Sequence, residues 1–389
     1  MADSKIRVCR DENMIRLGDV ATYINGYAFK PEDRGEEGLP IIRIQDLTGN
    51  AHDLGFYNGE YPKKVEINDG DILISWSASL GVYIWSEGKA LLNQHIFKVV
   101  FDKVAIDKNY FVYAVRRKLV EMGMKTHGAT MKHIVKKDFD ATLIPYPTLD
   151  KQAEIAVNLN KVSSIIEARE QELQLLDNLI KARFVEMFGD PVANDMGWNT
   201  LHLENACKSI VDCPHSTPSY TNEDTGFMCI RTSIVKKNKI LWNDIEYISE
   251  DEFVKRIQRK KPEVGDIVYT REGAILGIAA IIDRDCNVAL GQRSMLLSPD
   301  IDKCTSEFVC VAMNSDSFLD NVLKGVSGSA SPHINVGNIK AFRMIMPPIE
   351  LQKQFSNFVK QVDKSKVKVQ KALDETQKLF DSLMQQYFG

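Results

Sequence analysis

The residues with the clearest potential for catalysis are two carboxylates and a lysine in the first quarter of the chain: Asp71, Glu87 and Lys89. Two carboxylates can hold Mg²⁺ and a lysine can activate water, which is the chemistry of a metal-dependent nuclease. However, Gly70-Asp71 is typical of a turn before a strand, and the related segment Gly265-Asp266 keeps only that turn. A self-sufficient nuclease is therefore an alternative hypothesis and not the preferred one.

Other catalytic and metal-binding patterns are incomplete. A P-loop requires a glycine, four residues and then Gly-Lys-Ser/Thr, and the nearest segment, Gly88-Lys89-Ala90, lacks the first glycine and the hydroxyl. Residues 346–349 have the two prolines of an amino-methyltransferase motif without its polar and aromatic residues. Cys207, Cys213 and His215 do not have the spacing of zinc ligands. We expect no catalytic residue, bound metal or cofactor in this chain.

Polar, aromatic and basic residues in predicted loops have side chains that can recognise DNA bases. Arg and Lys bind guanine O6 and N7, Asn and Gln pair with adenine N6 and N7, and Ser or Thr can contact a base or a phosphate. The DNA-binding candidates in the first half of the chain are Tyr27, Lys30, Arg43, Ser75, Trp76, Gln94, His95, Thr130 and Lys132. Those in the second half are His215, Thr217, Arg231, Thr270, Arg271, Gln292, Arg293 and Ser329.

The candidates differ in how well their side chains suit base reading. The best suited are Gln94, Lys132, Arg271, Gln292 and Arg293. Taken singly, each of them is more typical of a surface or turn residue. A histidine also recurs, as His133 and His333, but its place just before a predicted strand indicates a structural role. Because the loops differ in chemistry between the halves, we expect the halves to read different sequences.

Composition and charge are those of an ordinary globular protein, with 44% hydrophobic and 26% charged residues in 389. The net charge of −4 argues mildly against a nucleic-acid binder that acts alone, although a partner subunit can supply phosphate contacts. Seven cysteines without a Cys-x-x-Cys pair favour reduced thiols in the cytoplasm. No apolar run approaches ~20 residues, so we expect no membrane partner.

The chain repeats itself at an interval of 200 residues. His133-Ile134 recurs as His333-Ile334, and Phe188-Gly189 recurs as Phe388-Gly389. A repeat of this length is a whole domain, because solenoid and propeller units have only about 20–50 residues. We therefore expect two domains of one architecture, related by a pseudo-two-fold axis. Such a molecule suits a two-fold partner, either a pair of identical subunits or two half-sites on a duplex.

Each half is predicted to consist of a mixed α/β part followed by one long helix. Short β-rich runs separated by turn residues predict strands at 39–44, 71–76, 82–85 and 96–101, and at 227–231, 266–270, 278–282 and 294–297. Helices are predicted over 109–124 and 306–323.

The long helices are predicted over 150–188 and 350–388, and each would span ~55 Å. Their apolar residues fall at three- and four-residue steps, in a stripe narrow enough for a two-helix coiled coil. Because Gly189-Asp190-Pro191 ends the first helix, the chain can return and pair the two antiparallel. The stripe residues, which we also expect to serve partner binding, are Ile155, Leu159, Val162, Ile166, Leu173, Leu176 and Ile180 in the first helix, and Phe355, Val359, Val362, Val369, Leu373, Phe380 and Leu383 in the second.

This order of motifs resembles the specificity subunit of type I restriction–modification systems over nearly the whole chain. The segments that carry the resemblance are 16–20, 40–44, the Gly-Asp turns at 70–71 and 265–266, Gln94 and Gln292, the two His-Ile pairs, and 144–152. The second half departs at 203–205 and 346–349, which weakens any transfer of residue roles there.

The resemblance implies an organisation into two target recognition domains of α/β type, at 1–147 and 190–346, separated by two conserved antiparallel helices at 148–189 and 347–389. It implies a bipartite, asymmetric site on double-stranded DNA, with one half read by each domain and the helices setting the spacing. It also implies two modification subunits that bring S-adenosylmethionine and methyltransferase chemistry, and two restriction subunits with the ATP-driven motor and the Mg²⁺-dependent nuclease. A coiled-coil scaffold that binds no DNA remains a second alternative.

Overall fold

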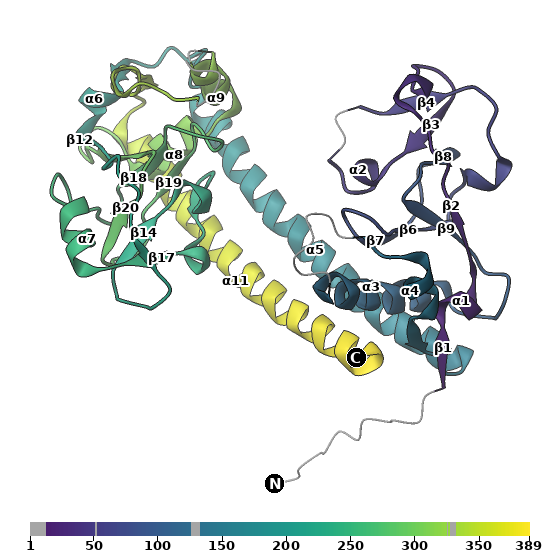
Figure 1. Cartoon of the computed structure of the whole chain (residues 1–389). Helices are drawn as coiled ribbons and strands as arrows, with labels where there is room; N and C mark the ends of the chain where they lie inside the picture. Colours follow the sequence, from purple (N-terminus) through teal and green to yellow (C-terminus); the bar gives the residue numbers. More distant parts are fainter. Residues whose placement is uncertain (1–12, 51–52, 126–132, 325, 327–331) are drawn as a thin grey trace, which may run out of the picture. The chain divides into compact units, whose positions relative to one another are not determined.

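The computed structural model describes residues 13–50, 53–125, 133–324, 326 and 332–389. The chain forms two compact units (Figure 1). Unit 1 consists of residues 1–169 together with 372–389, and unit 2 consists of residues 170–371. Within the described residues, no helix is both long enough and apolar enough to cross a membrane.

Unit 1 contains two four-stranded sheets and one short strand pair. The first sheet is antiparallel throughout, and in the second the two central strands run parallel. The first sheet has the order β2 (Thr22–Asn25), β9 (Ile96–Val100), β6 (Ile72–Ser75), β7 (Gly81–Ile84). The second has the order β4 (Gly55–Tyr57), β3 (Leu39–Ile42), β8 (Ala90–Leu92), β5 (Glu66–Ile67), and β1 (Met14–Arg16) pairs with β10 (Leu143–Pro145).

Helices complete the core of unit 1. They are α1 (Leu17–Val20), α2 (Ile44–Leu47), α3 (Lys108–Lys125), α4 (Lys136–Ala141), the single turns η1 (Pro31–Asp33) and η2 (Lys63–Val65), and parts of two long helices, α5 (Leu149–Phe188) and α11 (Ile349–Phe388). The main cluster of buried residues joins the first sheet to α3 through side chains such as Ile74, Phe97, Tyr110 and Phe111.

Unit 2 repeats the topology of the first sheet, and its second sheet keeps the parallel pair but has one strand of that pair, β20 (Val288–Leu290), at its edge. Its first sheet has the order β12 (Cys207–Asp212), β21 (Ser294–Pro299), β18 (Ile267–Thr270), β19 (Ala279–Ile281). Its second has the order β13 (Tyr220–Thr221), β17 (Glu246–Ile248), β14 (Met228–Ile230), β20 (Val288–Leu290), again with a parallel pair, β14 and β20. Two short pairs are β15 (Val235–Lys236) with β16 (Lys239–Ile240), and β11 (Thr200–His202) with β22 (Arg343–Ile345). The repeat seen in the sequence is thus a repeat of architecture.

The helices of unit 2 differ from the prediction at one place. They are α6 (Leu203–Ala206), α7 (Glu250–Arg256), α8 (Ser306–Met313), α9 (Asp316–Leu323), α10 (Val336–Lys340), η3 (Thr232–Ile234), η4 (Trp242–Asp244) and the remainder of α5 and α11. The prediction of a single helix over 306–323 is wrong, because the helix is interrupted between α8 and α9. Buried Asn314 exchanges two hydrogen bonds with the backbone of Ala279, and Ser315 caps α9 by accepting from the Phe318 N–H.

Each unit takes the beginning of one long helix and the end of the other. In unit 1, Ile155 and Leu159 of α5 lie in the same buried cluster as Met384 and Phe388 of α11. The Phe388 ring lies 5.2 Å from that of Tyr110 on α3. Since the start of α5 is buried with the end of α11, the helices run antiparallel in this unit.

Unit 2 shows the same arrangement shifted by 200 residues. Phe355 and Val359 of α11 share a buried cluster with Phe184 and Phe188 of α5. The Phe188 ring lies 5.0 Å from Phe308 and 5.5 Å from Phe355. The predicted fold class, mixed α/β domains with two long antiparallel helices, is confirmed.

A buried glutamine fixes the first turn of each long helix. Gln152 accepts from the Asp107 N–H at 2.9 Å and donates to the Pro147 carbonyl at 2.8 Å. Gln352 accepts from the Thr305 N–H at 3.1 Å and donates to the Pro347 carbonyl at 2.9 Å. This bonding explains physically why a glutamine recurs at the start of both long helices.

Every predicted stripe residue of α5 and α11 is buried or half-buried. The stripe residues near the helix ends lie in the cores of the units. The long helices therefore pack against other elements of each unit as well as against each other, unlike the helices of a simple coiled coil. The structure also shows polar contacts in the middle of the helices, which the sequence analysis did not predict. Arg169 donates to the Ala372 carbonyl and to Thr376, and Lys366 pairs with Asp177 at 2.8 Å in unit 2.

Candidate nucleic-acid interface

In unit 1, three segments converge where β6 ends, and we call them loop cluster 1: residues 75–77, 93–95 and 133–134. The Trp76 N–H donates to the His95 carbonyl at 3.3 Å, and the Ile134 N–H donates to the Trp76 carbonyl at 2.9 Å. Ser77 and His133 form an isolated bridge. The backbone around Trp76 therefore holds three distant segments together.

Unit 2 contains the corresponding loop cluster 2: residues 270–273, 291–293 and 332–334, joined by 212–217. The Arg271 N–H donates to the Arg293 carbonyl at 3.0 Å, and the Ile334 N–H donates to the Arg271 carbonyl at 2.9 Å. Glu272 and His333 form the matching isolated bridge. The two loop clusters thus share one backbone arrangement and present different side chains.

One residue in each loop cluster has an unusual backbone conformation. His95 has φ of 74° and Arg293 has φ of 70°, both in the left-handed region. That region costs residues other than glycine roughly 1–2 kcal/mol. The same strained position in two domains of different sequence indicates a feature of the fold that is kept for a reason.

The side chains of loop cluster 1 are mainly aromatic and imidazole rings. Trp76 stacks on Phe97 with ring centroids 5.5 Å apart and meets His95 and His133 edge-on at 5.0 and 4.8 Å. The Trp76 indole N–H is buried without a hydrogen-bond partner in the described part of the chain. The sequence singled out Trp76 and His95, and the structure adds His133 to their surface.

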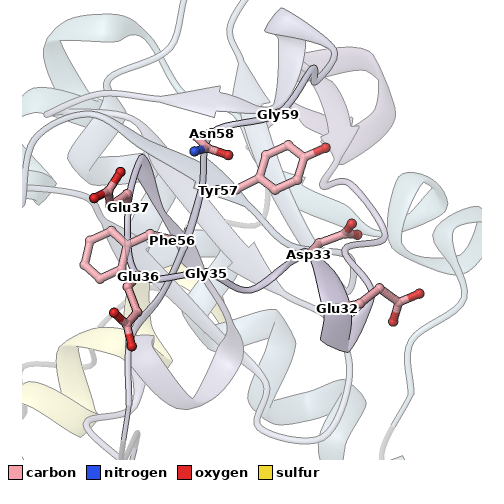
Figure 2. Close-up of a pocket in the computed structure, with 9 residues that line it drawn as sticks. All are labelled: Glu32, Asp33, Gly35, Glu36, Glu37, Phe56, Tyr57, Asn58 and Gly59. Carbon is pink, nitrogen blue, oxygen red and sulfur yellow. The ribbon is translucent and has the colours of Figure 1, made fainter.

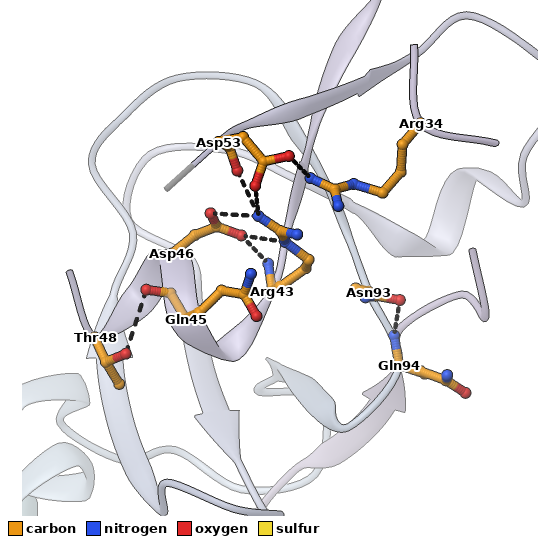
Figure 3. A network of polar contacts seen from close by, with 8 residues as sticks. All are labelled: Arg34, Arg43, Gln45, Asp46, Thr48, Asp53, Asn93 and Gln94. Atoms are coloured by element: carbon orange, nitrogen blue, oxygen red, sulfur yellow. Dashed lines mark hydrogen bonds and ion pairs between the residues drawn. The ribbon is translucent and has the colours of Figure 1, made fainter. Parts of the chain in front are cut away.

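Gln94 and Tyr27 lie side by side beside these rings. The Gln94 N–H donates to the Tyr27 carbonyl at 2.8 Å. It also donates to the Asn93 side chain at 2.8 Å (Figure 3). The close approach requires Gly26, because a Cβ there would lie 2.0 Å from the Asn93 carbonyl oxygen. The Gln94 side chain is exposed, and so is that of Lys30, which pairs with Glu32 at 3.8 Å.

Arg43, predicted to bind DNA, is instead neutralised within its own unit (Figure 3). Its guanidinium bonds Asp46 at 3.1 Å and lies 3.6 Å from Asp53, which also pairs with Arg34. The hydrogen bond to Asp46 raises the pKa of Arg43. Its counterpart Arg231 is more exposed but pairs with a carboxylate too, that of Glu246. Neither arginine has its full charge available to a phosphate or a base.

Two other candidates are buried hydroxyls. Ser75 has no exposed surface and donates to the Ser79 carbonyl, and Thr270 has none and accepts from the Ile278 N–H at 2.9 Å. These bonds close the hairpins that follow β6 and β18. A hydroxyl without exposed surface does not reach a base, so we assign both residues a structural role.

Arg271 also corrects the prediction, because its side chain is only 7% exposed. Its Nε and Nη2 bond the two carboxylate oxygens of Asp212 at 2.9 and 3.2 Å, and its Nη1 lies 2.7 Å from Glu272. His215 Nε2 lies 3.2 Å from the same Asp212 carboxylate. Arg271 therefore fixes the loop at 212–217 and does not present a free cation.

Gln292, Arg293 and Thr217 remain at the surface of loop cluster 2. The Thr217 hydroxyl donates to Gln292 Oε1 at 3.3 Å, so these two side chains are brought together. Sequence reasoning missed Arg256, whose buried guanidinium bonds Glu252 and the Ser216 carbonyl, each at 2.7 Å. The i,i+4 spacing of Glu252 and Arg256 was the available signal.

Three candidates, Thr130, Lys132 and Ser329, lie outside the described residues.

Two members of the carboxylate–lysine set of the nuclease hypothesis are paired with residues outside that set. Asp71 pairs with Lys98 at 2.7 Å, whereas Lys89 pairs with Glu66 at 2.9 Å. Across the described residues there is no group of side chains that could hold a metal ion. Burial raises the pKa of the Cys207 thiol to about 12, which does not suit a thiolate ligand. Nothing in the geometry supports catalysis at these residues.

A cavity of about 500 Å³ in unit 1 does not suit DNA (Figure 2). Negative side chains predominate around it, and they repel phosphate. The residues that line it are Glu32, Asp33, Gly35, Glu36, Glu37, Phe56, Tyr57, Asn58 and Gly59. The two loop clusters therefore remain the candidate interface.

Comparison with known proteins gives consistent similarities. The family model "Type I restriction modification DNA specificity domain" matches residues 10–178 and 198–376. The chain is 24% identical to the type I restriction enzyme EcoBI specificity subunit of Escherichia coli, covering 96% of this chain and 85% of that protein. It is also 24% identical to the MjaVIII specificity subunit of Methanocaldococcus jannaschii, covering 92% and 87%.

Solved structures share the fold. The S subunit of a type I restriction–modification system from M. genitalium aligns with a TM-score of 0.54 at 15% identity, covering 99% of this chain and 98% of that one. A chain from a study of assembly and conformational transition in a type I system aligns with a TM-score of 0.51 at 16% identity, covering 96% and 97%.

Proposed function

This chain belongs to the type I restriction–modification DNA specificity family, and we propose that it is the subunit that selects the DNA sequence for such an enzyme. The family model matches each half separately, so the chain carries two specificity domains. Each domain reads one half of a bipartite, asymmetric target on double-stranded DNA.

The observation that carries this proposal is the pair of loop clusters. Their backbone arrangement is the same, but the exposed residue His95 in unit 1 stands where the exposed residue Arg293 stands in unit 2. Side chains of different hydrogen-bonding type distinguish different base edges in the major groove. A shared scaffold with unlike surface residues is what two readers of unlike half-sites require.

We propose further that the chain works with modification and restriction subunits and carries no reaction of its own. Two modification subunits supply S-adenosylmethionine and the methyltransferase site, and two restriction subunits supply the ATP-driven motor and the Mg²⁺-dependent nuclease. The paired states of Asp71 and Lys89 support a chain without a nuclease site.

Exposed apolar side chains on α5 offer docking surfaces for modification subunits. In unit 1, Val157 and Ile165 are 50% and 45% exposed, and in unit 2, Leu175 and Leu179 are 65% and 46% exposed. At 3.6 residues per turn, Val157 and Leu175 lie on the helix side away from the buried stripe, and Ile165 and Leu179 lie at its flank. We propose that these exposed apolar side chains contact the modification subunits.

The length of the two helices, 40 residues each, sets the unread spacer in this proposal. An α-helix of that length spans ~60 Å, which exceeds the ~34 Å of one turn of DNA. The net charge of −4 fits an arrangement in which modification subunits make most phosphate contacts. The isolated chain is then expected to bind its target weakly.

Exchange of one domain tests the proposal. Residues 200–345 are replaced by the equivalent segment of a relative, and methylated positions are mapped in DNA treated with the complex of this chain and modification subunits. One half of the target should change and the other should stay. A change in both halves, methylation by the chain alone, or no DNA binding with partners present would contradict the proposal, and the last would favour a scaffold.

A further inference from the structure

We propose that Arg293 reads a guanine in the half-site of the unit 2 domain. This inference rests on the proposed function and names a specificity-determining residue within it. It depends on three observations: the charge of Arg293, which no carboxylate of the described residues pairs, the backbone that presents it, and the neighbours that surround it.

The charge of Arg293 distinguishes it from the other arginines near loop cluster 2. Three of those arginines are paired with carboxylates: Arg271 with Asp212 and Glu272, Arg256 with Glu252, and Arg231 with Glu246. Arg259 differs from them, because it donates to the backbone carbonyl of Asp212 at 3.3 Å. Arg293 is exposed, and no carboxylate among the described residues pairs with it. An exposed, unpaired guanidinium keeps all five N–H donors for a ligand.

The backbone holds Arg293 in a fixed place. Its carbonyl accepts from the Arg271 N–H at 3.0 Å, and Arg271 is itself held by Asp212. The Arg293 side chain lies beside Gly273, where a Cβ in place of the glycine hydrogen would stand 3.5 Å from Nη1. A part-buried ion pair therefore supports the segment that carries Arg293, which is the arrangement a binding site needs for precise positioning.

The neighbours of Arg293 complete a polar surface. Gln292 precedes it, and the Thr217 hydroxyl donates to Gln292 Oε1, which orients the amide. An arginine that donates two parallel hydrogen bonds to guanine O6 and N7 is the commonest specific contact in the major groove. A glutamine amide and a threonine hydroxyl beside it can contact the adjoining base or phosphate.

The left-handed conformation at Arg293 is not explained by folding alone. Glycine adopts φ of 70° without steric cost, yet an arginine occupies the position. The corresponding position in unit 1 has the same conformation and carries a histidine, His95. The fold therefore keeps a strained position in both domains and varies the side chain placed on it, as expected for a position that reads sequence.

The test uses the complex of the full chain with modification subunits. Methylation rates are measured on duplexes in which each base pair of the target is changed in turn, for the wild type, Arg293→Ala, Arg293→Gly and the control Arg284→Ala. Arg284 is an exposed arginine outside the loop clusters, and it lies over the Trp242 ring. For both Arg293 variants, discrimination should fall about 10- to 100-fold at one G·C pair of one half-site. Arg284→Ala should keep discrimination at every position.

Arg293→Gly separates reading from folding. Because glycine relieves the strained φ, this variant should melt no lower than the wild type while losing discrimination at the same base pair. Unchanged discrimination in both variants would overturn the inference. So would a uniform loss at all sequences with a shallower salt dependence, which identifies a phosphate contact. A wild-type complex without sequence-specific methylation would overturn the proposed function and this inference with it.

Discussion

The substitution Phe388→Ala tests the most unusual feature of the fold, which is that the last helical turn of the chain completes the core of unit 1. Phe388 is 1% exposed, and its ring lies 5.2 Å from that of Tyr110. Its carbonyl accepts from Lys118 Nζ at 3.1 Å. Met384, one turn earlier, lies in the same buried cluster.

The expected loss is large. Truncating a buried phenylalanine to alanine costs ~3–5 kcal/mol, because the transfer free energy of the ring is lost and a cavity remains. In a domain of 150–250 residues, each kcal/mol lowers the melting temperature by about 2–4 °C. The unfolding transition of unit 1 should therefore fall by roughly 10 °C, while that of unit 2 stays near its original temperature.

Calorimetry and hydrogen exchange measured by peptide together locate the effect. Faster exchange is expected in β2, β6, β9 and α3, which share the core with Phe388. Leu379→Ala is the matched control, because this residue lies on the same helix and is 51% exposed. Phe188→Ala should give the mirror result, with faster exchange in unit 2. A loss below ~1 kcal/mol for Phe388→Ala, or faster exchange in the strands of unit 2, would refute the reasoning.

Two further predictions concern polar groups. Gln352→Ala removes the side-chain partner of three backbone groups, the Thr305 N–H and the carbonyls of Lys303 and Pro347, and should cost ~1–3 kcal/mol in the free energy of unfolding by denaturant. Gln354→Ala at an exposed position should cost almost nothing, and equal losses would contradict the assigned role. The hydrogen bond with Lys89 lowers the pKa of Glu66, so this carboxylate stabilises the fold above the ordinary glutamate pKa of about 4.3 and loses that contribution as the pH falls through the lowered value. Melting curves of wild type and Glu66→Gln should converge in that acidic range, and a constant difference at all pH values would exclude the pair as a stabilising contact.

Sequence patterns predicted the elements whose signals are local or repeated. Strands β6 and β18 follow Gly-Asp turns, and the long helices show apolar steps of three and four residues without proline. The 200-residue interval predicted two domains, because a sequence repeat can be recognised without knowing which residues are in contact. Local propensity and repetition were therefore enough for the architecture.

The candidate interface was less predictable, because exposure depends on partners distant in sequence. Arg271 looks like a free base reader until it is seen against Asp212, 59 residues earlier in the chain. The break after α8 depends on Asn314 bonding the backbone of Ala279 in a neighbouring strand. No periodicity or spacing encodes such pairings, so sequence alone does not separate the paired arginine from the free one.

The division of the long helices between the units has a consequence for synthesis on the ribosome. Unit 2 is one continuous stretch, residues 170–371, whereas unit 1 needs residues 372–389, which are translated after all of unit 2. Domains usually fold in order from the N-terminus as they emerge. Unit 1 therefore keeps part of its apolar surface uncovered until residues 372–389, which follow unit 2 in the chain, have been made. A nascent chain stalled before residue 372 would thus hold a finished second domain and an unfinished first one, which makes the earlier half the one dependent on chaperones.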